Sequence, residues 1–343
     1  MKILCLTDFV KPGDRWLWKY LPSNNDEVDF LFTQGGLDRF PKWGKLIAYY
    51  PTYWQLGLRA LNQTRRTKYD IVVAWEGKNG FPYAMLRSMA GQKNPPFVIL
   101  TFIYRGLIRH FGPLARFGMR SVSHITVTTS FEAEYYQQIL SLKPETISLC
   151  PFPWYDSQWM TRSSNGSGES EKFVLASGRS YRDYATLAKA VAGLDIKVIV
   201  IARKFNLAGI ELPDNIETMD FMPLRDYHAL LHRAQFVVVP LQDLPHSAGD
   251  SHIVQSMSAG KAVIATRAPS PETYIEPGVT GRLVSPGDVE EMREAIVYLW
   301  QNPQETARMG QAARQRYEEN YTFEKVAQRV QDILLKVHHA ERV

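Results

Sequence analysis

The sequence has little cysteine and no long apolar run. Its two cysteines, Cys5 and Cys150, lie in apolar segments, so we expect buried, reduced thiols rather than a disulfide framework. The absence of any stretch of about 20 apolar residues argues against a membrane-spanning helix. Near the start, Asp8, Lys11 and Asp14 interrupt the apolar segment that a signal peptide would need. These absences predict a cytoplasmic protein.

Metal ligands are also scarce, because the eight histidines show no metal-binding spacing. His246 and His252 lie close together in the sequence, but two isolated imidazoles do not make a metal site. We therefore expect no metal and no bound cofactor. What the chain does have is an ordinary globular composition over 343 residues, of which 45% are hydrophobic and 22% are charged.

The length suits two domains, and the pattern of apolar segments indicates how each is built. Strand-like runs alternate with amphipathic helical segments, from KILCLT and IVVAW in the first half to FVLAS and QFVVV in the second. This alternation predicts two α/β domains, each a doubly wound parallel sheet. We place the domains at 1–155 and 156–322, and 323–343 is expected to form a helix that packs back on the first domain. Ser130 is expected to cap the helix that follows it.

Charge is divided unevenly between the two halves. Residues 1–150 carry 19 Lys and Arg against 11 Asp and Glu, a net charge of +8, whereas the rest carry 21 against 24, a net charge of −3. Only the first half is therefore expected to meet an anionic partner. Its segment YRGLIRHFGPLARFGMRS interleaves apolar side chains with four arginines, namely Arg105, Arg109, Arg116 and Arg120. The pattern is typical of peripheral docking on an anionic membrane, with an ordinary surface helix as the alternative, and we expect no nucleic-acid partner.

The most informative segment spans 240–288 and begins where an apolar strand is expected to end. The loop after this strand contains Gly249, and a helix is expected to start near Ser251. A glycine lets the backbone approach a ligand closely, and the first turn of a helix offers N–H groups to a phosphate. Because ligands of open α/β sheets bind beyond the carboxyl ends of the strands, Gly249, Asp250 and Ser251 are candidate ligands of a diphosphate. An ordinary strand–loop–helix connection is the alternative.

Two further segments give this loop a family context. QSMSAGKAVIAT and ETYIEPGVTGRLVSPGD resemble the signature of the retaining glycosyltransferases of group 1, also called family 4. The resemblance covers the second half of the chain, and over the first half it is only topological. It implies the GT-B fold, in which two Rossmann-like domains face each other across a cleft. It also implies a nucleotide-diphosphate sugar as the donor substrate in the second domain, an acceptor in the first, and no metal.

The sequence departs from the family at a pair of glutamates. The family holds the donor sugar and the ribose with two glutamates eight positions apart, and Ser247 and Gln255 occupy those positions here. Gln255 can still hydrogen-bond a ribose hydroxyl. Ser247 has no carboxylate to replace the first glutamate, so Asp243, Asp250 or Glu272 would have to supply one.

A second motif, SGRSYRDYATL, supplies cations. In the family, an arginine after the glycine and a lysine about six residues later bind the diphosphate. Gly178 and Arg179 match, but the lysine position is not basic, so Arg182 or Lys204 would take the second role. Cations suit this place because a leaving nucleoside diphosphate gains negative charge, while a surface salt bridge is the alternative for Arg179. The resemblance also places the nucleobase near Met222.

The first half offers two candidates for contact with an acceptor. Glu76 follows a buried strand in the segment WEGKNG, with helix capping or a salt bridge as its alternative role. Asp8 lies at the end of the first strand. Where the family often has a histidine, this chain has Phe102-Ile103-Tyr104, so the family's acceptor chemistry does not carry over.

Together these features predict a glycosyltransferase of the hexosyl, retaining type. It would move a sugar from a nucleotide diphosphate to a glycan or lipid-linked acceptor, with Arg179, Arg182, Asp250 and Glu76 as candidate catalytic residues. A GT-B sugar-nucleotide epimerase is one alternative, although it would need paired carboxylates and a histidine in the cleft. A catalytically inactive homologue that serves as a binding or partner subunit is the other, because the two glutamates are missing.

Overall fold

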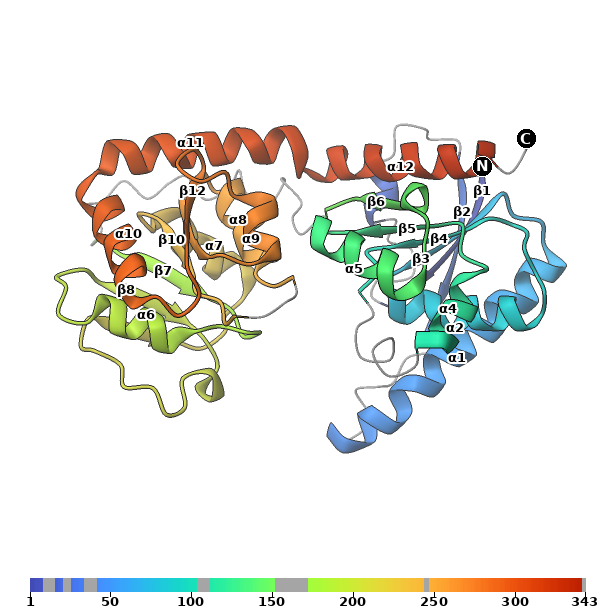
Figure 1. Ribbon diagram of the computed structural model, residues 1–343, viewed down its shortest axis with the longest axis horizontal. Coiled ribbons are helices and arrows are strands. Elements are labelled where there is room, and N and C mark those ends of the chain that lie inside the picture. The colour runs from blue at the N-terminus through green and yellow to red at the C-terminus, as the bar shows by residue number, and fades with distance from the viewer. Residues whose placement is uncertain are drawn as a thin grey trace. The chain divides into compact units, whose positions relative to one another are not determined.

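The computed structural model describes residues 1–8, 16–20, 26–33, 42–103, 112–151, 172–243 and 247–340. The chain divides into two compact units. Unit 1 comprises Met1–Phe152 and Val326–Val343, and unit 2 comprises Pro153–Lys325. Each unit contains a six-stranded parallel sheet with helices packed against it (Figure 1). The predicted fold class, two doubly wound α/β domains, is confirmed.

The sheet of unit 1 has the strand order β2-β1-β3-β4-β5-β6. Its central strands are almost entirely buried, as expected for parallel strands that are covered on both faces. The strands are β1 (Lys2–Thr7), β2 (Glu27–Phe32), β3 (Ile71–Trp75), β4 (Phe97–Leu100), β5 (His124–Val127) and β6 (Ile147–Leu149).

Helices of unit 1 cover this sheet with their apolar faces. Tyr83 of α2 packs edge-on against Phe97 of β4, with 4.8 Å between the ring centroids. The predicted cap at Ser130 is wrong by one residue, because the side chain of Thr129 accepts the hydrogen bond from the Glu132 N–H. The helical segments are η1 (Trp16–Tyr20), α1 (Lys42–Arg66), α2 (Gly77–Met89), α4 (Gly112–Met119), α5 (Ser130–Leu140), η3 (Pro144–Thr146) and α12 (Phe323–Ala340), which begins in unit 2.

The sheet of unit 2 has the strand order β12-β11-β10-β7-β8-β9. Numbered within the unit, this is the order 3-2-1-4-5-6 read from β9, so the direction of winding reverses between β7 and β10. The strands are β7 (Val174–Ser177), β8 (Val198–Ile201), β9 (Ile216–Met219), β10 (Val237–Val239), β11 (Val263–Thr266) and β12 (Gly281–Val284).

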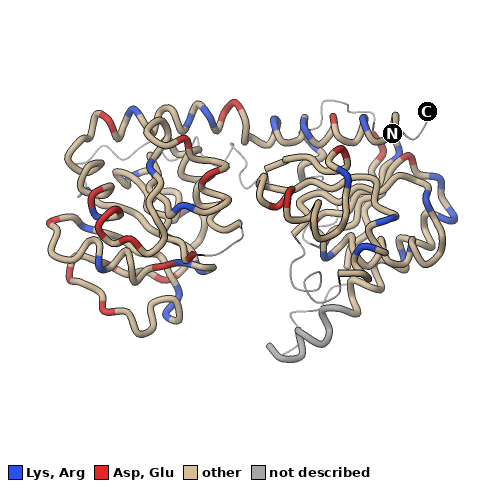
Figure 2. Tube along the Cα trace, viewed as in Figure 1, with Lys and Arg blue, Asp and Glu red and all other residues tan. Residues whose placement is uncertain are grey.

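Two apolar layers hold the helices of unit 2 on the two faces of its sheet. One layer includes Ile253 and Met257 of α8, and the other includes Leu187 of α6 and Ile296 of α10. The helical segments are α6 (Tyr184–Val191), η5 (Lys204–Asn206), α7 (Leu224–Arg233), α8 (Asp250–Ser258), α9 (Pro269–Tyr274), α10 (Val289–Gln301) and α11 (Pro303–Asn320). Acidic residues are more frequent in unit 2 than in unit 1, as Figure 2 shows.

Candidate active site

The two loops at the reversal point of unit 2 are joined to each other. The Asp183 N–H donates to the Pro240 carbonyl at 3.1 Å, and the Gln242 N–H donates to the Tyr181 carbonyl at 3.0 Å. These bonds tie the loop that follows β7 to the loop that follows β10. Because ligands of doubly wound sheets bind at this reversal point, beyond the carboxyl ends of the strands, the fold itself marks the place of a site.

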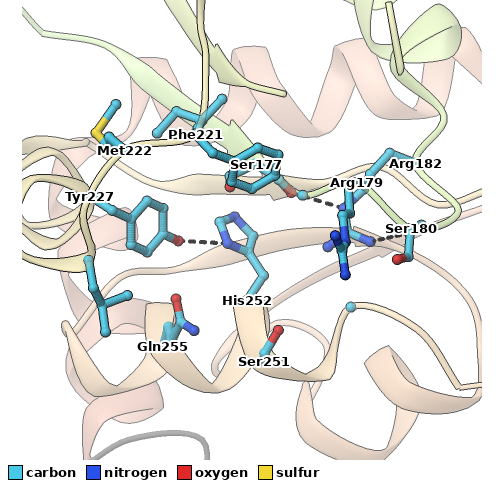
Figure 3. A pocket seen from close by; sticks show the side chains of 14 residues that line it. Ser177, Arg179, Ser180, Arg182, Phe221, Met222, Tyr227, Ser251, His252 and Gln255 are labelled. Atoms are coloured by element: carbon cyan, nitrogen blue, oxygen red, sulfur yellow. Dashed lines mark hydrogen bonds between the residues drawn. The ribbon is translucent and has the colours of Figure 1, made fainter. Parts of the chain in front are cut away.

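A cavity of about 430 Å³ lies there. Figure 3 shows its lining, with tyrosine and methionine side chains at one end and arginines at the other. The volume is within the range of pockets that hold small ligands, about 300–1,000 Å³. The lining residues are Ser177, Gly178, Arg179, Ser180, Arg182, Ile201, Phe221, Met222, Leu224, Tyr227, Gly249, Ser251, His252 and Gln255.

Arg182 is a partly buried cation held by backbone carbonyls. Its Nε donates to the Ser177 carbonyl at 2.9 Å, and Nη1 donates to the Ser180 carbonyl at 2.8 Å. Burial lowers the pKa of Arg182, but an arginine remains protonated at physiological pH. Within the described part of the chain, no carboxylate forms an ion pair with this guanidinium. A partly buried positive charge with no described carboxylate at ion-pair distance favours an anionic ligand.

The backbone at Gly178 makes room for that guanidinium. Gly178 has a φ of +122°, a value that L side chains rarely adopt, and a Cβ built on it would overlap the guanidinium of Arg182. The carbonyl of Gly178 also accepts a hydrogen bond of 2.7 Å from the Tyr184 hydroxyl. A glycine at the end of β7 is therefore required for the position of Arg182.

The first turn of α8 forms another wall of the cavity. Gly249 caps this helix with a φ of 88°, and its carbonyl accepts hydrogen bonds of 3.0 Å from the N–H groups of His252 and Ile253. Gly249 and Ser251 line the cavity, so the positive end of the α8 dipole lies beside the arginines. This arrangement is suited to a phosphate.

A buried pair of aromatic side chains lies between the two ends of the cavity. His252 is 4% exposed, and its Nδ1 is 2.6 Å from the hydroxyl of Tyr227 on α7. Burial, together with the nearby charge of Arg182, lowers the pKa of His252 to about 3. The imidazole is therefore neutral at physiological pH.

The opposite end of the cavity is mainly apolar. Ile201 at the end of β8 lines it, together with Met222 from the loop before α7 and Leu224, the first residue of α7. Phe221 lies there as well, and the guanidinium of Arg203 stacks over its ring at 5.0 Å from the centroid. Apolar and aromatic side chains of this kind suit a planar heterocycle such as a nucleobase.

Most of the residues predicted for the donor site lie together in this cavity: Gly178, Arg179, Arg182, Met222, Gly249, Ser251 and Gln255. Three others lie in the same unit but not in the cavity lining. Lys204 is exposed at the start of η5, and Ser247 lies before Gly249. Asp250 is the first residue of α8, and its charge acts on Arg182 by raising the pKa of that residue against the effect of burial.

Glu76 belongs to unit 1, where it is part of a polar cluster at the carboxyl ends of β1 and β3. Lys78 Nζ lies 2.9 Å from a Glu76 oxygen and 3.0 Å from an Asp8 oxygen. Asp8 also accepts hydrogen bonds from the Tyr53 hydroxyl at 2.7 Å and from Asn79 Nδ2 at 3.0 Å. Burial raises the pKa of Asp8, but the Asn79 bond and the Lys78 charge outweigh it, so this pKa lies below its usual value.

Glu76 itself adopts a strained backbone conformation, with a φ of 66°. It stands at the N-cap of α2 but makes no capping hydrogen bond with its side chain. Of its alternative roles, the structure therefore contains the salt bridge and not the cap.

The sequence analysis did not select several lining residues. Ser177 and Ser180 belong to the motif SGRSYRDYATL but were not selected from it, and Ile201, Leu224 and Tyr227 carry no motif. His252 was considered only as a metal ligand. Their common signal is position. Ser177 and Ile201 end the strands β7 and β8, and Ser180 lies in the loop after β7. Leu224, Tyr227 and His252 lie in the first turns of α7 or α8.

The expectations about metal ions and membranes concern some residues that the structure does not describe. The described ranges contain no cluster of three or more acidic, histidine or cysteine side chains arranged for a metal ion, and no helix in them is long and apolar enough to cross a membrane. His246, Arg105 and Arg109 lie outside these ranges. Arg116 is described, and its Nε donates to the Ile139 carbonyl at 2.9 Å.

Comparison with known proteins gives a family match within unit 2 and two sequence relatives. Residues 157–316 match the family model of glycosyl transferases group 1. An MMP α-(1→4)-mannosyltransferase of Mycolicibacterium hassiacum is 28% identical over 122 residues, which are 35% of this chain and 29% of that protein. The D-rhamnosyltransferase WbpZ of Pseudomonas aeruginosa is 27% identical over 160 residues, which are 44% of this chain and 42% of that protein. The match thus spans less than half of either relative.

Solved structures resemble the chain over nearly its whole length. A sucrose-phosphate synthase of Thermosynechococcus elongatus has a TM-score of 0.77 at 16% identity, covering 99% of this chain and 100% of that one. The Anabaena protein HepE in complex with UDP has a TM-score of 0.70 at 17% identity, covering 98% and 100%. At these identities the likeness concerns the fold alone. The chain has the GT-B fold, and its residues 157–316 are similar to the group 1 glycosyltransferases.

Proposed function

We propose that this chain transfers a sugar from a nucleoside-diphosphate donor bound in the cavity of unit 2. The observation that carries the proposal is Arg182, a partly buried cation whose described hydrogen-bond partners are backbone carbonyls. Arg179 and the first turn of α8 line the same cavity. Three positive features at one end and an apolar wall at the other suit a ligand with a diphosphate at one end and a heterocycle at the other.

Each end of the cavity then has a role. Arg179 and Arg182 stabilise the charge that grows on the leaving diphosphate, and the N–H groups near Gly249 and Ser251 add hydrogen bonds. Gln255 lies one turn further along α8 and holds the ribose. Phe221 and Met222 contact the base. HepE of Anabaena, whose fold is similar, has been solved in complex with UDP. UDP is a ligand of the proposed class, which supports the assignment.

The reaction follows from these contacts. The bond between the sugar carbon and the diphosphate oxygen breaks, and a bond from the same carbon to an acceptor hydroxyl forms while that hydroxyl loses its proton. We propose a hexose donor and a retaining outcome, with a glycan or a lipid-linked sugar as the acceptor. In unit 1, the cluster of Asp8, Glu76 and Lys78 is the proposed contact for acceptor hydroxyls.

The test is release of nucleoside diphosphate from sugar nucleotides. The protein is incubated with UDP-, GDP- and ADP-sugars, with and without a mixture of glycan and lipid-linked acceptors. If the protein transfers the sugar, the release of nucleoside diphosphate should depend on the acceptor. An epimerase would change the sugar nucleotide with no acceptor and no stoichiometric release, and an inactive homologue would bind the nucleotide without turnover.

A further inference from the structure

His252 is the one buried histidine in the lining of the cavity, among the described residues. Figure 3 shows its ring between Tyr227 on one side and Arg182 on the other, with the ring nitrogen that does not face Tyr227 pointing away from it. A ligand that spans the cavity from Met222 to Arg179 therefore passes His252. The position is at the border between the apolar end and the cationic end.

The contact with Tyr227 decides which nitrogen of His252 carries the proton. A phenol is a stronger acid than a neutral imidazole N–H, and the unprotonated imidazole nitrogen is a stronger base than a phenol oxygen. On this ground we assign the 2.6 Å contact as an O–H of Tyr227 that donates to Nδ1. The neutral ring then carries its hydrogen on Nε2.

This Nε2–H is a buried donor without an acceptor among the described residues. A buried donor with no acceptor destabilises a fold, so such groups are normally paired with protein, water or ligand. Neutrality also matters, because a second cation beside Arg182 would be repelled, whereas a neutral donor is not. Burial and the charge of Arg182 both keep the pKa of His252 low, which preserves the neutral form.

We propose that His252 Nε2–H donates a hydrogen bond to the phosphate of the donor nucleotide that is next to the ribose, and that Tyr227 positions His252 for this contact. The proposal rests on the proposed function, because it needs a nucleoside diphosphate in the cavity. The register along α8 favours that phosphate. Ser251 and His252 are in the first turn, beside the arginines, and Gln255, the ribose contact, is one turn further on.

The experiment is calorimetric titration with UDP, GDP and ADP, taking whichever of the three binds the wild-type protein, and with the corresponding nucleoside. His252→Leu removes the donor, and His252→Gln restores an N–H group near the place of Nε2. His124→Leu is the matched control, because His124 is equally buried, at 3% exposed, but belongs to unit 1. Thermal unfolding is measured for every variant, so that only folded proteins are compared.

We expect His252→Leu to weaken diphosphate binding about 10- to 100-fold, in line with loss of a hydrogen bond to a charged group. His252→Gln should recover most of this affinity, His124→Leu should bind as the wild type does, and nucleoside binding should hardly change. An equal loss for the nucleoside would overturn the assignment to the phosphate. Unchanged diphosphate binding in His252→Leu, while Arg179→Ala binds weakly, would overturn the proposal and leave the proposed function intact.

The role of Tyr227 has its own readout. Nitrogen-15 NMR of labelled histidine should show His252 as the Nε2–H tautomer in the wild type, and the Nε2 resonance should shift on addition of the diphosphate. Tyr227→Phe should alter the tautomer balance and weaken diphosphate binding while the protein stays folded. An Nδ1–H tautomer in the wild type would contradict the positioning role. Failure of UDP, GDP and ADP alike to bind the wild-type protein would overturn this proposal and the proposed function together.

Discussion

At the residue scale, the site depends on how unit 2 places its cations. Arg182 was one of two residues that the sequence offered in place of the missing lysine, and the other was Lys204. The structure brings Arg182 into the cavity and leaves Lys204 exposed outside the lining. Sequence spacing does not show whether Arg182 or Lys204 reaches the cavity. The conformation of the loop after β7, which places the Arg182 side chain against Gly178, decides this.

Arg179 and Lys204 provide a matched pair of variants, because one lines the cavity and the other does not. Arg179→Ala removes an exposed cation that lines the cavity, and Lys204→Ala removes an exposed cation that does not. Arg179→Ala should weaken nucleoside-diphosphate binding by about 1.5–3 kcal/mol, because a charge-assisted contact with phosphate is lost. Lys204→Ala should bind as the wild type does. Equal affinities of wild type and Arg179→Ala in calorimetry would remove Arg179 from the site.

His252 also predicts a pH dependence of stability. Its pKa is about 3 in the folded protein and 6.5 as the ordinary value, so below pH 6.5 the unfolded chain binds a proton that the folded chain does not. The free energy of unfolding should therefore fall as the pH decreases from about 6.5, by up to about 1.4 kcal/mol per pH unit from this group.

Urea unfolding at pH 7, 6 and 5 measures this effect, with His252→Gln as the reference because glutamine does not titrate. As the pH falls, the free energy of unfolding of the wild type should decrease relative to that of the variant. A difference that stays constant with pH would show that His252 titrates near its ordinary pKa.

At the element scale, the strands and helices follow from the sequence more closely than their ends do. Alternating apolar segments predict β7, β8, β10 and the helices after them, because parallel strands covered on both faces must be apolar throughout. Caps are less certain. The Ser130 prediction fails because Thr129 and Ser130 are adjacent and both are able to cap, and only the backbone direction after β5 decides between them.

The loop after β7 provides the test at this scale. Gly178→Ala should displace the Arg182 guanidinium, so we expect nucleoside-diphosphate affinity to fall about 10-fold or more, with about 1–3 kcal/mol of stability lost. Gly193→Ala is the control, since Gly193 also has a positive φ, of +73°, but nothing lies within 4 Å of the added Cβ. Calorimetry should show a binding defect in Gly178→Ala only, and equal binding by both variants would mean that the position of Arg182 does not matter.

At the scale of the whole molecule, the two units differ in how far the sequence explains them. Unit 2 carries a family signature and a cavity that contains most of the predicted residues. Unit 1 has the predicted sheet, but its candidate acceptor contacts are held in a salt-bridged cluster. A motif reports a ligand that a whole family shares, such as a nucleotide. It says little about an acceptor, for which each protein has its own side chains.

The +8 charge of residues 1–150 predicts reversible docking of unit 1 on anionic membranes. Each Lys or Arg near such a surface contributes about 1 kcal/mol, and salt screens the attraction. Co-sedimentation with vesicles should require anionic lipid and weaken with salt. It should weaken further when Arg105, Arg109, Arg116 and Arg120 are replaced by Gln. Protein that stays in the supernatant with anionic vesicles at low salt would favour a soluble acceptor.

The central claim, that unit 2 binds a nucleoside-diphosphate sugar, is tested most directly by thermal unfolding with UDP, GDP, ADP and their sugars. A ligand at 100 times its dissociation constant should stabilise the folded protein by about 2.7 kcal/mol. The account predicts that at least one nucleoside diphosphate raises the unfolding temperature, that its nucleoside does so far less, and that Arg179→Ala abolishes most of the shift. No shift with any of these nucleotides, at concentrations up to several millimolar, would contradict it.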